Sequence, residues 1–83
     1  MNVKFIVTKD GRVVFGEKDY KKDGHSTIAF FQKIPDENVL CGGIADTESR
    51  RIWGTSTGYG DYNVQHMQRL LPDWRIDPPG RYD

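Results

Sequence analysis

The sequence predicts an α+β fold: a small mixed β-sheet of about five to six strands with two helices packed on it. Short segments rich in β-branched and aromatic residues predict the strands, and two segments with apolar residues three or four positions apart predict the helices. Turns containing Gly, Pro or Asp separate these segments, which follow one another in the order β-β-α-β-β-α-β. At 83 residues the chain is too short for a second core. We therefore expect one domain over residues 1–83, with 78–83 as a polar tail.

The first half of the chain predicts a hairpin followed by a helix. We expect strands at 3–7 and 12–16 and a short helix at 25–33. Gly11 lies in the turn between the strands, where a positive φ costs glycine little. The helix has apolar side chains at 28, 31 and 34. Pro35 ends it, because the residue before a proline is disfavoured in the α region.

The second half predicts three strands and one helix. We expect strands at 38–45, 50–53 and 74–76 and a helix at 62–71. Gly42 and Gly43 fall inside a strand, where a glycine pair indicates either a bulge or the close approach of another backbone or a ligand. Asp61 is a suitable N-cap for the helix, and Pro72 follows its end.

Composition excludes several classes of protein. Twelve basic and twelve acidic side chains cancel, which removes the electrostatic argument for a nucleic-acid partner. No segment has the ~20 apolar residues that span a bilayer, so we expect no membrane partner. Cys41 is the one cysteine, which argues against a disulfide scaffold and for a reducing, cytoplasmic setting. A lone cysteine and two distant histidines make a metal site improbable, so we expect no metal and no cofactor.

The segment 53–60 carries three glycines and three Ser or Thr side chains between a strand and a helix. Glycines let backbone N–H groups turn inward, and such concave sets of amides bind anions. A helix N-terminus nearby would add partial positive charge. Ser56, Thr57 and Gly58 lie at the centre of this segment, which lacks the Gly-Lys-Ser/Thr ending of a P-loop. The alternative is a tight connection that uses glycine for turn geometry alone.

Two charged or titratable residues could complete such a site. His25 stands at the expected start of a helix, where neighbouring amides favour the neutral imidazole that can accept a proton from water. The alternative is a surface or capping histidine. Lys4 lies in the apolar alternation of the first strand and either points to solvent or reaches over the sheet to an anion. A Cys41–His25 nucleophilic pair has no identifiable third residue to orient it.

Taken together, these segments resemble the Janus/Ocnus family, the small phosphohistidine phosphatases. The family pattern Tyr-His-Ala-Asp-Ile corresponds to residues 24–28, and Cys-Leu-Gly-Gly-Gly corresponds to 39–43. Tyr-Gly-Tyr-Ser-Met-Ala-Tyr-Gly is similar to 53–60, where Trp-Gly-Thr-Ser-Thr-Gly-Tyr-Gly stands here. The family's early Phe-Lys-Tyr-Val strand is similar to residues 3–6. The resemblance covers nearly the whole chain in the same order.

The resemblance implies a metal-independent phosphatase acting on phosphohistidine or a related phosphoramidate. It assigns His25 the role of general base, while Lys4 and the backbone around Ser26, Ser56, Thr57 and Gly58 would bind phosphate. The partner would then be a phosphorylated protein or a small phosphoramidate.

Two departures from the family pattern leave other hypotheses open. Gly24 replaces an aromatic residue before the histidine, and Ile44 stands where members often carry arginine. A non-catalytic module that binds phosphate or a protein, for instance as an inhibitor, is the second hypothesis. A structural or oligomer-forming protein is the third, and the sequence leaves the oligomeric state open.

Overall fold

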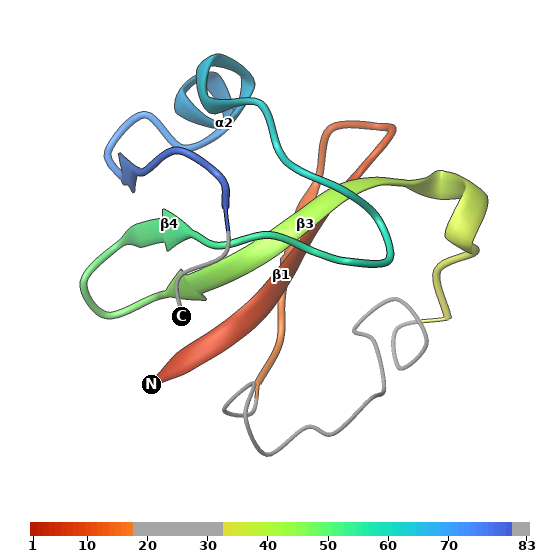
Figure 1. Cartoon of the computed structure of the whole chain (residues 1–83), viewed down its shortest axis with the longest axis horizontal. Helices are drawn as coiled ribbons and strands as arrows, with labels where there is room; N and C mark the ends of the chain where they lie inside the picture. The colour runs from red at the N-terminus through yellow and green to blue at the C-terminus, as the bar shows by residue number, and fades with distance from the viewer. Residues whose placement is uncertain (18–32, 81–83) are drawn as a thin grey trace.

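The computed structural model describes residues 1–17 and 33–80, which form a five-stranded mixed sheet with one α-helix beside it (Figure 1). The strands are β1 (Asn2–Thr8), β2 (Val13–Phe15), β3 (Val39–Asp46), β4 (Arg51–Trp53) and β5 (Arg75–Ile76). A 3-10 helix, η1 (Asp36–Asn38), precedes β3, and the α-helix is α2 (Val64–Leu70). The predicted small α+β fold with a mixed sheet is confirmed.

The strand order is β2-β1-β3-β4-β5. β1 pairs antiparallel with β2 and β3, and β3 pairs antiparallel with β4. β4 and β5 are parallel, since the connection that contains α2 carries the chain back before β5 begins. β1 and β3 are the longest strands and form the centre of the sheet.

One face of the sheet carries the main core. Val3, Phe5 and Val7 point to this face, because alternate residues of a strand project to the same side. The fully buried Met67 of α2 and the buried Tyr62 cover them. The Phe5 ring lies 5.7 Å from the Tyr62 ring, measured between centroids. Trp74 stacks on Phe15, with the ring centroids 5.2 Å apart.

The opposite face carries a smaller cluster around Ile6 and Val39. Val14, Ile34 and Tyr59 pack against these two residues. Tyr59 belongs to the segment that leaves β4, and Figure 1 shows this segment crossing β3 and β1 before it reaches α2. A connecting loop therefore covers part of this second face.

The glycine pair in β3 is a place of close approach. A Cβ at Gly42 would lie 2.8 Å from the carbonyl oxygen of Phe5, and one at Gly43 would lie 2.7 Å from the Phe5 ring. The register between β1 and β3 runs through both glycines without a shift, and its irregularity falls between Val7 and Thr8. Of the two alternatives for the pair, a bulge is therefore wrong and close approach is right.

The predicted strands are present within one or two residues of their expected ends. The helix predicted at 62–71 is present as α2, but Asp61 as its N-cap is wrong. Asn63 caps α2, because its backbone is extended and its side-chain oxygen accepts a hydrogen bond from the His66 N–H at 2.9 Å. Asp61 instead accepts a hydrogen bond from the Thr55 hydroxyl.

The helix predicted at 25–33 falls almost wholly outside the described residues. The expected pair of helices and the full order β-β-α-β-β-α-β therefore remain predictions. Within residues 1–17 and 33–80, no helix is long and apolar enough to cross a membrane.

An ionic cluster fastens the last strand to the sheet. Asp77 accepts hydrogen bonds from Arg51 Nε at 2.7 Å and Arg75 Nε at 3.1 Å, which links the residue after β5 to β4. The Arg51 guanidinium also lies 4.8 Å from the centre of the Trp53 ring. The hydrogen bond from Arg51 is the main reason that the pKa of Asp77 lies below its ordinary value of 3.8.

Replacing Gly42 by alanine should destabilise the fold by about 1–3 kcal/mol, because the new Cβ meets backbone that cannot rotate away. Gly58→Ala is the matched control, since nothing lies within 4 Å of a Cβ there. We expect that control to change the free energy of unfolding by less than about 1 kcal/mol. Urea denaturation measures the free energy of unfolding of both variants. Equal losses of this free energy in Gly42→Ala and Gly58→Ala would contradict the close approach at Gly42.

Asp77 should make stability depend on pH in the acid range. A carboxyl whose pKa is lower in the folded state contributes stability above its unfolded pKa, and this contribution is lost as the pH falls through the folded pKa. Asp77→Asn should thus be less stable than the wild type at neutral pH, and the difference should shrink below pH of about 4. Thermal unfolding across this range tests it. Asp73→Asn, a change at an exposed carboxylate, is the control. If its difference in stability from the wild type also shrank at acid pH, Asp77 would have no specific role.

Candidate functional site

The segment 54–60 forms a closed turn on the second face of the sheet. Gly54 and Gly60 have φ angles of 79° and 92°, which favour glycine. Between them, the Ser56 hydroxyl oxygen accepts a hydrogen bond from the Tyr59 N–H at 3.1 Å, and the Ser56 carbonyl accepts one from the Gly60 N–H at 2.8 Å. Ser56 thus organises the turn through two groups of its own.

The turn is fastened to the rest of the fold at several points. The Gly42 N–H of β3 donates to the Gly60 carbonyl at 3.3 Å. β4 pairs with β3 only from Ile44 onward, so the turn occupies the edge of β3 that β4 leaves uncovered. The Tyr59 hydroxyl donates to Asp36 of η1 at 2.6 Å. This last contact joins residues 23 positions apart, and no sequence pattern signalled it.

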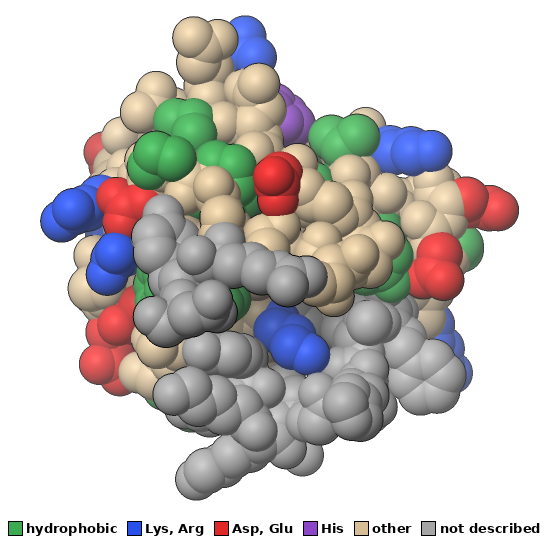
Figure 2. Space-filling view, in the orientation of Figure 1, with side chains coloured by type: hydrophobic (Ala, Val, Ile, Leu, Met, Phe, Trp, Pro, Cys, Tyr) green, Lys and Arg blue, Asp and Glu red, His purple; other side chains and the backbone are tan. Residues whose placement is uncertain are grey.

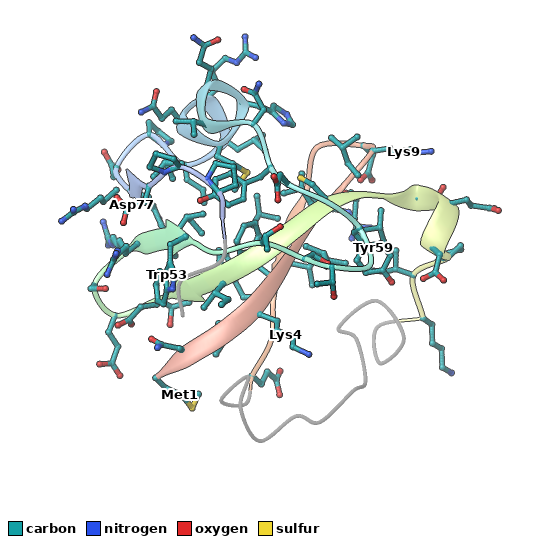
Figure 3. The ribbon with its side chains drawn as sticks, viewed as in Figure 1. Met1, Lys4, Lys9, Trp53, Tyr59 and Asp77 are labelled. Carbon is teal, nitrogen blue, oxygen red and sulfur yellow. The ribbon has the colours of Figure 1, made fainter. Side chains whose placement is uncertain are left out.

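Lys4 lies on the same face as this turn. In the pairing of β1 with β3, Lys4 lies opposite Ile44. The start of the turn packs on Ile44, since a Cβ built on Gly54 would lie 2.9 Å from Ile44 Cδ1. Two residues along β1, Ile6 pairs with Gly42, and Ser56 lies over that glycine. Figure 3 shows the half-buried Lys4 side chain below the turn that carries Tyr59. The lysine is therefore a diagonal neighbour of the Ser56 turn.

The turn offers several groups to an anion. The N–H groups of Ser56, Thr57 and Gly58 form no hydrogen bond to another described residue, and Thr57 and Gly58 are exposed. Gly58 does not have a positive φ, so its conformation is one that other residues can adopt. The structure thus brings together Lys4, Ser56, Thr57 and Gly58. His25 and Ser26, which were predicted to complete the site, lie outside the described residues.

Two features qualify the electrostatics of this face. The expected contribution from a helix N-terminus finds no support here, because Tyr62 and Val64 at the start of α2 pack in the main core, whereas Tyr59 of the turn packs on the opposite face. The carboxylates of Asp36 and Asp61 border the turn, where they accept hydrogen bonds from Tyr59 and Thr55. Among the coloured atoms of Figure 2, acidic and basic side chains alternate over the surface. Any anion bound here is therefore held by local groups and not by the overall field.

Cys41 lies on the other side of the sheet, in the main core. Burial raises the pKa of the Cys41 thiol, which disfavours the nucleophilic thiolate at neutral pH. No group of three His, Cys, Asp or Glu side chains capable of holding a metal occurs in residues 1–17 and 33–80. The chemistry that the described residues offer is therefore hydrogen bonding and positive charge.

In comparisons with known proteins, no family model matches the sequence, and no match was found among curated proteins or solved structures.

Ser56→Ala should loosen the turn, because it removes the side-chain acceptor of the Tyr59 N–H. We expect a loss of about 1 kcal/mol in the free energy of unfolding and faster hydrogen exchange at the Tyr59 amide. Thr57→Ala, at an exposed neighbour, should leave both measurements unchanged. Unaltered exchange at Tyr59 in the Ser56 variant would show that the hydroxyl does not hold the turn.

Proposed function

We propose that this protein is a metal-independent phosphohydrolase that removes phosphate from phosphohistidine or a related phosphoramidate. One observation carries the proposal: Lys4 and the Ser56 turn, far apart in sequence, occupy neighbouring positions on one face of the sheet. The resemblance to the Janus/Ocnus family assigns phosphate binding to these same residues. The role of His25 in the proposal rests on that resemblance alone.

The groups at this face suit a phosphoryl oxygen. Backbone N–H groups of Ser56, Thr57 and Gly58 can donate to the oxygens, and the Lys4 ammonium can balance part of their charge. Phosphoryl transfer needs mainly positioning and charge stabilisation, so a site of amides and one lysine is chemically sufficient for binding. Anchoring of the turn at Gly42 and Asp36 keeps these donors in place before substrate arrives.

In the proposed reaction a water oxygen attacks phosphorus, and His25 accepts the proton that the water loses. The P–N bond breaks as the P–O bond forms. The electron pair of the broken bond goes to nitrogen, which leaves as the neutral amine or imidazole after protonation. A P–N bond suits a site without a metal, because protonated nitrogen departs readily.

Release of inorganic phosphate from phosphohistidine and phosphoramidate, measured with the wild type and matched variants, tests the proposal. His25→Ala should lower kcat by about 100-fold or more, the usual contribution of a general base. His66→Ala, at the other histidine in the sequence, should retain full activity. Lys4→Met keeps the length and apolar stem of the side chain, and we expect it to lower kcat/KM with a smaller effect on kcat.

Arg69→Gln, an exposed change on α2, is the control for lost positive charge. Equal rates in the wild type and His25→Ala would remove His25 from the mechanism. Phosphate binding that depends on Lys4, without turnover of either substrate, would instead identify the chain as the non-catalytic phosphate-binding module. If Lys4→Met kept both full activity and full phosphate binding, the phosphate site at this face would be refuted.

A further inference from the structure

A recess lies at the hairpin end of the sheet. It encloses about 640 Å³ between the β1–β2 turn and the residues that precede η1. That volume is typical of sites for small organic ligands. Val14, Ile34 and Pro35 supply an apolar wall, while Thr8 and Asn38 add polar groups. Three basic residues, Lys9, Arg12 and Lys33, also border it, against one acidic residue, Asp10.

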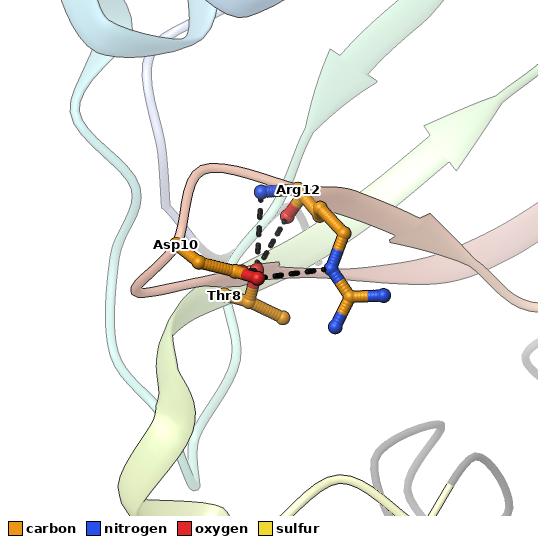
Figure 4. A network of polar contacts seen from close by, with 3 residues as sticks. All are labelled: Thr8, Asp10 and Arg12. Carbon is orange, nitrogen blue, oxygen red and sulfur yellow. Dashed lines mark hydrogen bonds and ion pairs between the residues drawn. The ribbon is translucent and has the colours of Figure 1, made fainter.

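The hairpin turn holds Arg12 in a defined orientation (Figure 4). Asp10 accepts hydrogen bonds from the hydroxyl of the buried Thr8 and from Arg12 Nε, the latter at 3.2 Å. The Thr8 hydroxyl oxygen in turn accepts from the Arg12 N–H at 3.0 Å. Among contacts with described residues, the guanidinium donates through Nε alone, and Figure 4 shows its two terminal nitrogens on the side away from Asp10. These nitrogens remain as a paired donor for a carboxylate or phosphate.

The two lysines add positive charge that is not neutralised locally. Neither Lys9 nor Lys33 forms an ion pair with a described residue. The Lys9 backbone N–H donates to the Asn38 carbonyl at 2.8 Å, which fastens the hairpin turn to η1 and fixes the distance between the two walls. With Asp10 offset by Arg12, Lys9 and Lys33 leave the described lining of the recess with two positive charges beside an apolar wall.

We propose that this recess binds a small organic anion: a carboxylate or phosphate group held by Arg12, Lys9 and Lys33, with an apolar body against Val14, Ile34 and Pro35. This site is separate from the proposed phosphohydrolase site and does not depend on it. Thr8 and Val14 share a sheet face with Lys4, but Ile6 lies between Lys4 and Thr8 along β1. A ligand can therefore occupy one site while the other is empty.

Amide NMR titration with benzoate and phenylphosphonate tests the proposal, and neither probe is hydrolysed. Both should shift the amides of Lys9, Arg12 and Asn38, and the stronger of the two identifies the preferred head group. The uncharged benzyl alcohol should shift them far less. Arg12→Gln should weaken binding about tenfold. Lys33→Gln should weaken it also, and it leaves the Thr8–Asp10 contacts intact. The control Arg69→Gln should bind as the wild type does.

Absence of saturable shifts at these amides with either anion would overturn the proposal. Equal binding of benzyl alcohol, or unchanged affinity in both Arg12→Gln and Lys33→Gln, would overturn it as well. Shifts confined to the amides of 56–58 would show that the anions prefer the Ser56 turn, which also rules out this recess as their site. Failure of phosphatase activity in the preceding assays has no bearing on any of these results.

Discussion

The contact between β1 and β3 at the glycine pair is the constraint on which the rest of the structure depends. Consecutive residues of a strand point to opposite faces, so Gly42 and Gly43 leave space on different sides of the same sheet. On the core side, the absent side chain of Gly43 makes room for the Phe5 ring, which then packs against Tyr62. On the other side, the absent side chain of Gly42 lets Ser56 lie directly on the strand. One dipeptide therefore permits both the packing of the core and the position of the candidate site.

Four carboxylates of the described residues position other side chains. Asp77 orients Arg51 and Arg75 at one edge of the sheet, and Asp10 orients Arg12 at the hairpin turn. Asp36 and Asp61 hold the two ends of the Ser56 turn through hydroxyl groups. Zero net charge thus conceals an uneven local distribution, in which positive charge faces the sheet surface near Lys4 and the recess near Lys33. A formal charge count therefore says little about where a small anion could bind.

The candidate site is built on an irregular turn, which hydrogen bonds anchor to β3 and η1. A short β4 leaves part of β3 without a strand partner, and the turn closes this gap through Gly42 and Gly60. Donors on such an anchored turn are preorganised, which is what binding of a tetrahedral anion requires. This anchoring would suit a catalyst and a non-catalytic phosphate-binding module equally well. What distinguishes the two is whether a general base reaches the phosphoryl group.

The sequence by itself determined the fold class, the approximate places of the strands and the presence of a helix within 62–71, which spans Val64–Leu70, because apolar spacing and turn residues are local properties. It also indicated Lys4 and the 53–60 segment as candidates. Only the tertiary structure decided that they share a face, since that depends on pairing Lys4 with Ile44 and Ile6 with Gly42. The cap at Asn63 in place of Asp61 is a local contact, with His66 three positions on, that the sequence analysis did not single out. The bond between Tyr59 and Asp36 and the recess near Arg12 were decided by packing, because each joins segments that are distant in the sequence and meet only in the folded chain.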